Sequence, residues 1–386
     1  MWWYITSKVV FGKNAVLALK DIQGKRAIIV TDESISRLGL VNKIAKILKK
    51  SEIAVRVFDK VEPEPSTQTV MKGAAIMRRF HPDWVIGLGG GSCIDAAKAM
   101  RVMYERPDLR IEDINPFNSL GLGRKARLIA IPTTSGTGSE TSCFVVLTLS
   151  DGHKKVAFGS GELCPDIAIV DPVMSRSMPP KLRARSGFDA LSHAIEAYGS
   201  TWNNEFSDAM AIKAIQMVFE YLPKACNDND PTAQEKMHYA ATIAQMASTN
   251  SEAGLAHAMA HKLGGHYKIP HGELISVFQV YSVQFVAKSC PRRYADMARA
   301  IGEKFDSDAE GATRFINDLR KLIETVGLPS SLRQLGIDEN DFRSKLENLA
   351  AETFVDDSAI AIPRMPSVQE LSRLFTYSFD GRDIDF

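Results

Sequence analysis

The sequence has little net charge, no long apolar run and no clustered cysteines. Its formal net charge is +1, so it offers no strong electrostatic field to attract nucleic acid or an anionic membrane. It contains no run of about 18 or more apolar residues, the length that a membrane-spanning helix needs. With 45% apolar and 24% charged residues, its composition is that of a globular protein. Neither nucleic acid nor a membrane is therefore expected as a partner.

Cysteine is scarce and scattered. The five cysteines are odd in number, and no two of them form a Cys-x-x-Cys pair. This pattern is typical of free thiols in a reducing compartment. The first fifteen residues lack the basic region, apolar core and cleavage site of a signal peptide, and we interpret them as a strand. The expected location is the cytoplasm.

The first half of the chain alternates strand-like and helix-like segments. Short runs rich in isoleucine and valine predict strands, and the stretches between them have helical spacing. This alternation predicts a parallel sheet covered by helices on both faces. Ser66 is a candidate cap for one of the helices. The predicted strands cover residues 26–32, 53–61, 84–92, 126–134 and 167–172, and the third of them runs into a glycine loop.

The second half has almost no strand-like runs. From Met178-Pro179-Pro180 onward helical patterns dominate, and no repeat or low-complexity tract occurs. We predict an α/β, Rossmann-like domain with a parallel sheet over residues 1–180. An all-helical domain is predicted over residues 181–386.

Two loops that follow strands are candidates for binding a nucleotide. Residues 87–92 (GLGGGS) join a strand to a helix, where glycines and the helix N-terminus suit a phosphate, although a tight turn explains them equally well. Residues 133–139 present five hydroxyls and two glycines after another strand. A capped helix start is the simpler explanation of this second loop. Two such loops on neighbouring strands of one sheet favour a nucleotide at the carboxyl ends of the strands.

Histidine, by contrast, is concentrated in one place. Four of the eight histidines lie within 15 residues: His257, His261, His266 and His271. Imidazole is the commonest protein ligand for transition metals and titrates near neutral pH. The cluster therefore predicts a metal site, a proton relay or both. The remaining histidines without clustered partners are expected at the surface: His81, His153 and His238.

A further pair of potential ligands precedes this cluster. Asp189 and His193 are four residues apart, and residues at this spacing share one face of a helix. Taken alone, such a pair is more commonly an exposed pair on a helix. His271 follows a break at Gly265, so it belongs to the next element. One carboxylate and several imidazoles from separate elements suit a divalent Fe, Zn, Mn or Co ion. His266 is expected in a turn between helices, as a loop residue or substrate neighbour.

At these residues the chain resembles the iron-containing (group III) alcohol dehydrogenase family. The segments that carry the resemblance are GGGSCIDAAKA, PTTSGTGSE, FDALSHAIEAY and GLAHAMAHKLGGHYKIPHGE. It extends from the first strand to about residue 280 and more loosely to the end. EFSDAMAIKAIQMVFEYLP and MAHKLG are similar to the alcohol dehydrogenase half of bifunctional aldehyde/alcohol dehydrogenases. The resemblance implies a dehydroquinate synthase-like fold, with a cofactor domain followed by a metal-binding and substrate domain.

The resemblance also implies roles for individual residues. The implied metal ligands, normally for Fe(II), are Asp189, His193, His257 and His271. His261 is the implied proton relay near the nicotinamide. The implied cofactor residues are Gly89, Gly90, Gly91, Ser92, Asp95, Thr133, Thr134, Thr137 and Asp32. A carboxylate at Asp32 accepts from a ribose 2′-hydroxyl and repels a 2′-phosphate, so NAD(H) is expected in preference to NADP(H). Zn(II) binds such ligands more tightly than Fe(II), which makes it an alternative occupant.

The implied activity is that of a metal-dependent, NAD(H)-linked alcohol dehydrogenase or aldehyde reductase. The substrate alcohol would bind the metal as an alkoxide and pass hydride to NAD. A small alcohol or aldehyde is the expected substrate, and a homodimer or larger homo-oligomer is the expected assembly. Some residues depart from the family pattern and bear on the substrate: Ser248, Glu252, Ala253 and Lys262.

Three alternatives stay open. A Zn-dependent glycerol dehydrogenase and a dehydroquinate synthase-like lyase would share the fold, NAD and a metal. A lyase needs lysines and arginines near the metal for a phosphorylated substrate, and the histidine run offers only Lys262 and Lys268. The third alternative is a non-catalytic, metal-bound assembly protein, whose apolar first residues, 1–4, would pair with the sheet edge of another chain.

Overall fold

The chain divides into two compact units, Met1–Met178 and Pro179–Phe386. The computed structural model describes residues 3–115, 118–149 and 155–386. Of the segments discussed above, residues 1 and 2 and His153 lie outside the described residues.

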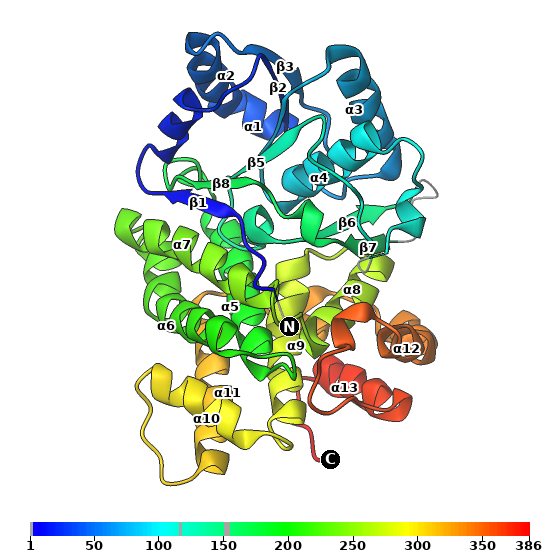
Figure 1. Cartoon of the computed structure of the whole chain (residues 1–386). Coiled ribbons are helices and arrows are strands. Elements are labelled where there is room, and N and C mark those ends of the chain that lie inside the picture. The colour runs from blue at the N-terminus through cyan, green and yellow to red at the C-terminus, as the bar shows by residue number, and fades with distance from the viewer. Residues whose placement is uncertain (1–2, 116–117, 150–154) are drawn as a thin grey trace. The chain divides into compact units, whose positions relative to one another are not determined.

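The first unit is built on a six-stranded sheet (Figure 1). All five strand pairs are parallel, and the strand order is β1-β8-β5-β4-β2-β3. The predicted parallel sheet is confirmed. Within the described residues 3–14, the edge strand β1 is the only regular element. The strands are β1 (Lys8–Phe11), β2 (Arg26–Val30), β3 (Ala54–Phe58), β4 (Trp84–Gly89), β5 (Arg127–Pro132) and β8 (Ile167–Val170).

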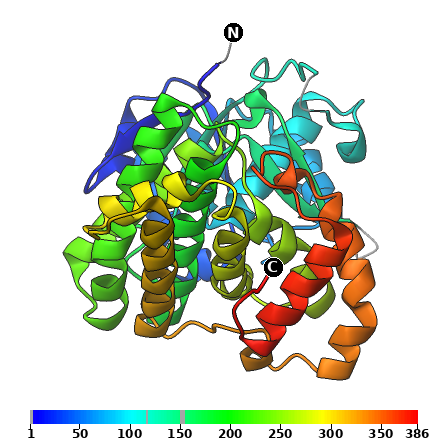
Figure 2. The ribbon, with the colours of Figure 1, turned by 90° about the horizontal axis from the view of Figure 1, so that it is seen from below.

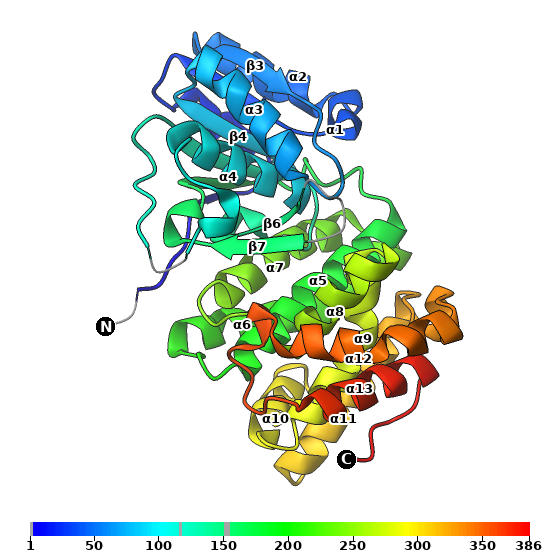
Figure 3. The same cartoon turned by 90° about the vertical axis from the view of Figure 1, so that its right-hand side faces the viewer.

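Alternate residues of the central strands face two separate cores, because successive side chains of a strand point to opposite faces. In β2, Ile28 and Val30 pack with the helices α3 and α4, which lie side by side in Figure 3. Ala27 and Ile29 pack with η1 and α2 on the other face. Ser66 caps α3 by accepting from Thr69 N, as predicted. The helices are η1 (Ala15–Lys20), α1 (Glu33–Arg37), α2 (Leu40–Lys50), α3 (Thr67–Phe80) and α4 (Gly91–Glu105), with short turns η2 (Ile111–Asp113), η3 (Ser139–Thr141) and η4 (Gly161–Leu163).

A small antiparallel hairpin is present that the sequence did not predict. Its strands β6 (Phe144–Thr148) and β7 (Lys155–Gly159) pair with each other, and Thr148 of β6 also forms a single parallel bridge to Ser66. Val145 and Leu147 are buried in the core that includes α3 and α4. The strand β6 therefore packs against α4.

The second unit is helical throughout its described residues. Figure 2 shows the last helices, α12 and α13, side by side, and the rings of Phe342 and Phe379 stack between them at 4.7 Å. In the described residues, none of the helices combines the length and apolar character needed to cross a bilayer. The helices are α5 (Pro180–Gly199), α6 (Glu205–Asn227), α7 (Pro231–Ser248), α8 (Leu255–Tyr267), α9 (His271–Val286), α10 (Pro291–Ala300), α11 (Asp308–Thr325), α12 (Glu339–Phe354) and α13 (Val368–Asp380), with turns η5 (Arg333–Leu335) and η6 (Asp357–Ala359).

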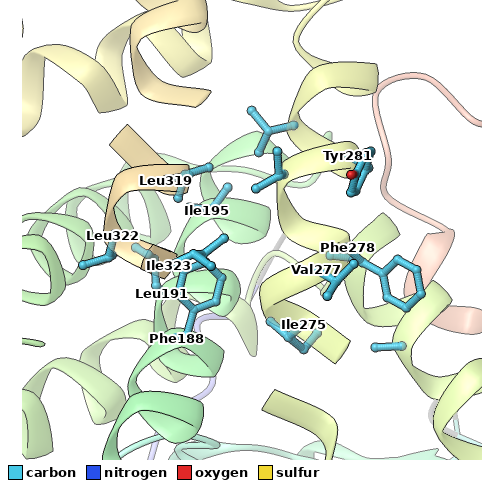
Figure 4. Packing of buried hydrophobic residues seen from close by; sticks show 14 of the residues in the cluster. Phe188, Leu191, Ile195, Ile275, Val277, Phe278, Tyr281, Leu319, Leu322 and Ile323 are labelled. Atoms are coloured by element: carbon cyan, nitrogen blue, oxygen red, sulfur yellow. The ribbon is translucent and has the colours of Figure 1, made fainter. Parts of the chain in front are cut away.

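The helix α9 forms the centre of this unit. Nearly all its side chains are buried, which is typical of a core helix. Figure 4 shows Ile275, Val277 and Phe278 of α9 among the apolar residues that α5 and α11 contribute to the same cluster. The N-terminus of α9 is therefore held firmly next to α5, which matters because both helices carry predicted metal ligands.

Candidate functional site

Three helices of the second unit bring together three of the four predicted metal ligands. Asp189 Oδ1 lies 3.6 Å from His257 Nε2 and 3.5 Å from His271 Nε2. One possible ligand atom from each of these residues lies within 4.8 Å of the others. The fourth predicted ligand, His193, lies beside this group, with its ring 4.4 Å from the ring of His257.

Local sequence explains how the side chains meet. Asp189 and His193 are one turn apart on α5, and His257 and His261 repeat that spacing on α8. His271 is the first residue of α9, because the preceding proline occupies the N-cap and ends the turn after α8. Each of the three helices therefore presents its ligands from a rigid backbone.

Three buried atoms of this cluster lack hydrogen-bond partners within the described part of the chain. Among the described residues, Asp189 Oδ1, His193 Nδ1 and His257 Nε2 are buried and make no hydrogen bond. An unpaired buried polar atom costs about 1–3 kcal/mol. Coordination to a cation would remove this cost, so the residues fit a divalent metal with nitrogen and oxygen ligands.

The electrostatics of the cluster also favour a cation. Burial raises the pKa of Asp189, but His193, His257 and His271 outweigh it and hold that pKa well below its usual value. Burial lowers the pKa of His193 to about 3, so this imidazole is neutral, as a ligand must be. Burial also lowers the pKa of His257, but Glu196 and Asp189 outweigh burial and raise it to about 10. The carboxylates of Asp189 and Glu196 leave an excess of negative charge at the cluster, and a divalent cation would neutralise it.

One side of the cluster is open. The side chains of Asp189 and His257 are 5% and 4% exposed, whereas that of His271 is 39% exposed. His261, the predicted proton relay, lies on this open side with its ring stacked on His271 at 5.5 Å. A metal held here would keep an accessible position, the feature that separates catalytic from structural metal sites.

The two predicted cofactor loops of the first unit are in contact. They follow β4 and β5, which are neighbouring strands. A Cβ atom added to Gly90 would lie 3.3 Å from Thr134 Cγ2, and one added to Gly91 would lie 3.0 Å from Thr137 Oγ1. Glycine therefore allows the hydroxyl loop to lie against the start of α4.

The glycine loop is fixed at its first residues. Gly89 has φ +152°, and a Cβ atom there would lie 2.7 Å from Cys93 Cβ, so only glycine fits. The Gly89 carbonyl accepts from Thr133 N at 2.9 Å. Ser92 Oγ donates to the Pro63 carbonyl at 2.5 Å. The loop is thus attached to both neighbouring segments before any ligand binds.

Asp95 connects the two loops through hydrogen bonds within the protein. Its Oδ1 accepts from Ser139 Oγ at 2.5 Å and its Oδ2 from Val146 N at 3.1 Å. The buried Lys98 donates to the same Ser139 hydroxyl at 2.9 Å and lies 3.7 Å from Asp95. Asp95 was predicted to bind the cofactor; in this structure its Oδ1 binds the hydroxyl loop and its Oδ2 binds the backbone of β6.

Asp32 lies at the end of β2, the other neighbour of β4. Its Oδ1 caps α1 by accepting from Ile35 N at 2.9 Å, and its Oδ2 accepts from the Cys93 thiol at 3.3 Å. Burial raises the pKa of Cys93, which keeps the thiol protonated as a donor. The structure therefore places Asp32 next to the glycine loop.

Family models match both units. A model described as "Iron-containing alcohol dehydrogenase" matches residues 6–172, and one described as "Fe-containing alcohol dehydrogenase family, C-terminal" matches residues 183–379. The chain belongs to the iron-containing alcohol dehydrogenase family. The predicted resemblance is confirmed.

Members of this family resemble the chain over its whole length. The "NADPH-dependent butanol dehydrogenase" of Clostridium saccharobutylicum is 39% identical over 98% of this chain and 98% of that protein. The "Bifunctional aldehyde-alcohol dehydrogenase" of Escherichia coli is 36% identical over 99% of this chain, which spans only 47% of that protein. The solved structure of the iron-containing alcohol dehydrogenase from Thermococcus thioreducens, with 34% identity, superposes with a TM-score of 0.91, covering 99% of this chain and 100% of that one.

Glu196 is a further residue of the site, and it was not predicted from the sequence. Its Oε2 lies 2.5 Å from His257 Nδ1, and its Oε1 accepts from Ala256 N at 2.7 Å. Gly254 makes room for this carboxylate, because a Cβ atom there would lie 2.9 Å from Glu196 Cδ. Glu196 is seven residues after Asp189 on α5, two helical turns along the same face, and that spacing was the signal available in the sequence.

Two predictions about histidines outside the metal group were wrong. His266 is not in a turn: α8 continues through Gly265 to Tyr267, because the small Gly264 allows close packing against Leu274. Its Nε2 lies 3.3 Å from Glu352, outside the ligand group. His238 is 1% exposed rather than on the surface, because α7 packs against both α5 and α6. His81 is exposed, as predicted.

Glu252 occupies a position that suits glycine. Its φ is +71°, in the left-handed region that disfavours residues with a Cβ atom. Burial, together with the charges of Asp357 and Asp356, raises the pKa of its carboxyl to about 7. Both the backbone and the side chain of Glu252 are therefore under strain at neutral pH.

We expect Glu252→Gly to raise the unfolding temperature of the metal-free protein, and to do so more above pH 7 than near pH 4.5. In the parent, the folded chain keeps the Glu252 proton up to about pH 7, whereas the unfolded chain loses it near 4.5. Stability therefore falls across this window, by up to roughly 3 kcal/mol. Glycine removes this loss and the backbone strain. Thermal unfolding at several pH values measures the effect, and a pH-independent difference would show that the carboxyl contributes nothing.

Proposed function

We propose that this chain is a metal-dependent, NAD(P)(H)-linked alcohol dehydrogenase that also reduces aldehydes. Asp189, His193, His257 and His271 would hold the cation, Fe(II) in the usual family form and Zn(II) as an alternative. The observation that carries the proposal is the convergence of Asp189, His257 and His271 from three helices. Within the described residues, the buried Asp189 Oδ1 and His257 Nε2 have no hydrogen-bond partner.

The residues around the proposed metal site have different roles in the reaction. A divalent cation, when bound, supplies Lewis-acid polarisation of an alcohol or carbonyl oxygen, and NAD(P)(H) supplies the hydride chemistry. Glu196 accepts from His257 Nδ1 and so directs the Nε2 lone pair toward the cluster. His261, on the open side, takes or gives the proton of the substrate hydroxyl at a ring nitrogen. The enclosed walls formed by Asp189 and His257 exclude water from the ligand side.

The cofactor is proposed to bind to the loops of the first unit. The backbone N–H groups of residues 89–92 lie at the N-terminus of α4. The N-terminus of a helix attracts an anion such as a pyrophosphate. Thr137, which is exposed, and Thr134, which is partly exposed, offer hydroxyls on the adjacent loop. The butanol dehydrogenase relative supports a short primary alcohol, or its aldehyde, as substrate.

Metal reconstitution combined with a substrate panel tests this function. Metal-free protein is loaded with Fe(II) under anaerobic conditions or with Zn(II), and NADH and NADPH absorbance is followed with short primary alcohols, diols, glycerol and aldehydes. We expect activity that depends on added metal and is highest with short primary alcohols or aldehydes. Bound metal without turnover of any alcohol or aldehyde would contradict the proposal and favour a non-catalytic, metal-bound assembly protein.

The same panel separates the enzymatic alternatives. Glycerol oxidation only with Zn(II) would favour a glycerol dehydrogenase. A dehydroquinate synthase-like lyase would need cationic side chains for a phosphorylated substrate, but Lys262 is already paired with Asp356 at 2.7 Å.

We also propose that the chain forms a homo-oligomer, in line with its exposed edge strand β1, where Phe11 is 70% exposed. Light scattering measures the assembly.

We expect Asp32→Ser to raise the ratio of kcat/KM for NADP+ to that for NAD+ by roughly 10- to 100-fold. Unit charges about 4 Å apart repel by roughly 1 kcal/mol in water and 4 kcal/mol near a protein surface. Serine is also a good N-cap, so α1 keeps its cap while the charge is lost. Glu33→Gln is the matched control, because it removes a neighbouring exposed carboxylate that pairs with Lys60. A parent enzyme that already prefers NADP+ would contradict the role of Asp32.

A further inference from the structure

His261 has two polar neighbours that come from a distant part of the chain. Its Nδ1 lies 3.4 Å from Ser358 Oγ, a residue 97 positions further along, and 3.6 Å from Asp356 Oδ1. Both neighbours belong to the turn around η6, between α12 and α13. Nothing in the spacing of the histidine run indicates this contact.

Asp356 is held in place as a buried carboxylate. Its side chain is 9% exposed, and Lys262 Nζ lies 2.7 Å from Oδ2. Ser358 N donates to Oδ1 at 3.0 Å, so this oxygen keeps one lone pair for His261. Burial raises the pKa of Asp356, but His261 and Lys262 outweigh it and hold the pKa well below its usual value. The group that faces His261 is therefore an anion that only accepts hydrogen bonds.

We propose that Asp356 is a positioning residue for His261, whose carboxylate keeps the imidazole proton on Nδ1 and leaves Nε2 as the proton acceptor. The proposal rests on the proposed function, in which His261 carries the substrate proton. A neutral imidazole has one N–H and one lone pair, and the carboxylate favours the tautomer whose N–H faces it. The opposite tautomer would direct a lone pair at an anion.

The same contact fixes the orientation of the ring. The imidazole of His261 stacks on that of His271, with 19° between the ring planes. Asp356 and Ser358 hold the Nδ1 edge from one side, so rotation about the side chain would break both contacts. Lys262 is next to His261 on α8 and binds the other oxygen of Asp356, which keeps the carboxylate from turning away.

Ring nitrogen spectra and steady-state kinetics on Zn(II)-loaded protein test this role. In Asp356→Asn the acceptor for Ser358 N remains, so the turn keeps its cap while the anion is lost. We expect ¹⁵N NMR to show His261 protonated on Nδ1 in the parent, and a mixture of tautomers in the variant. The kcat is expected to fall roughly 10- to 100-fold with KM changed less than about twofold and with metal content unchanged. Asp356→Glu, which restores a carboxylate, is expected to recover part of the loss.

Asp338→Asn is the matched control, because Asp338 caps α12 in the same way at an exposed position. It should change neither the spectrum nor kcat. If Asp356→Asn fails to fold, Asp356→Ser retains a capping oxygen too short to reach His261. An unchanged His261 tautomer with the anion removed would overturn the proposal, as would a kcat loss shared by Asp338→Asn. If the parent turns over no alcohol or aldehyde, the proposed function fails, while the ring spectra still decide the role of Asp356.

Discussion

Replacing His271 with alanine is expected to abolish metal retention and to lower alcohol dehydrogenase activity by roughly 1,000-fold, since a Lewis-acid cation contributes several kcal/mol to the transition state. His271 supplies the only ligand atom that α9 brings to the group of three. Asp189, His193 and His257 would remain, but such an incomplete set holds a divalent ion weakly compared with all four ligands. Metal analysis of the purified variant, together with its turnover of a short alcohol, measures both losses.

His266→Ala is the control for this experiment. His266 has the same side chain and lies on α8 close to the site, but it pairs with Glu352 and takes no part in the ligand group. We expect it to keep its metal and most of its activity. Full turnover by metal-free His271→Ala would refute the metal assignment, and equal losses in both variants would point to general disruption of the helices.

Replacing Gly272 with alanine is expected to have the second largest effect, a loss of metal affinity and activity of roughly 100-fold or more, although every ligand remains. A Cβ atom at Gly272 would lie 2.8 Å from the backbone carbonyl carbon of Arg185, in the second turn of α5. The backbone of α5 cannot shift aside as a flexible side chain could, so α9 must move away from α5. Asp189 follows Arg185 by one turn and lies 3.5 Å from His271. A displacement of about 1 Å at a catalytic group costs roughly 100-fold.

Gly265→Ala provides the matched substitution. Gly265 lies within α8 near the site, yet a Cβ atom there would meet nothing within 4 Å. Alanine in a helix interior is more stable than glycine by roughly 0.5–1 kcal/mol, so this variant should gain stability and keep its metal. The comparison separates the close approach of α9 to α5 from any general effect of adding a methyl group. Normal metal binding by Gly272→Ala would show that the approach of α9 is not needed.

The sequence predicted the parts of the site whose residues are close in the chain. The spacing of Asp189 and His193, and of His257 and His261, predicted one helical face each, because a helix turn fixes which residues meet. The glycine and hydroxyl loops were found because their residues have backbone requirements that few other sequences satisfy. Glu196 was within reach of the same helical reasoning and was missed.

Errors arose where packing overruled local pattern. The two glycines before His266 suggested a break, but α8 runs through them because Gly264 faces α9. His238 was predicted at the surface, but it is buried because α7 packs against both α5 and α6. The hairpin of β6 and β7 was missed because its strands are stabilised by pairing and by burial on α4, and not by a strong pattern of their own.

By itself the sequence determined an α/β unit followed by a helical unit, and it identified the histidines and loops that mark the family, because hydrophobic periodicity and helical spacing are local properties. Only the tertiary structure decided how those residues work together. Three helices bring Asp189, His257 and His271 within 4.8 Å, and a turn almost one hundred residues away places Asp356 beside His261. Such contacts depend on how helices pack, which is set by side-chain volume across the whole core and cannot be deduced from spacing along the chain.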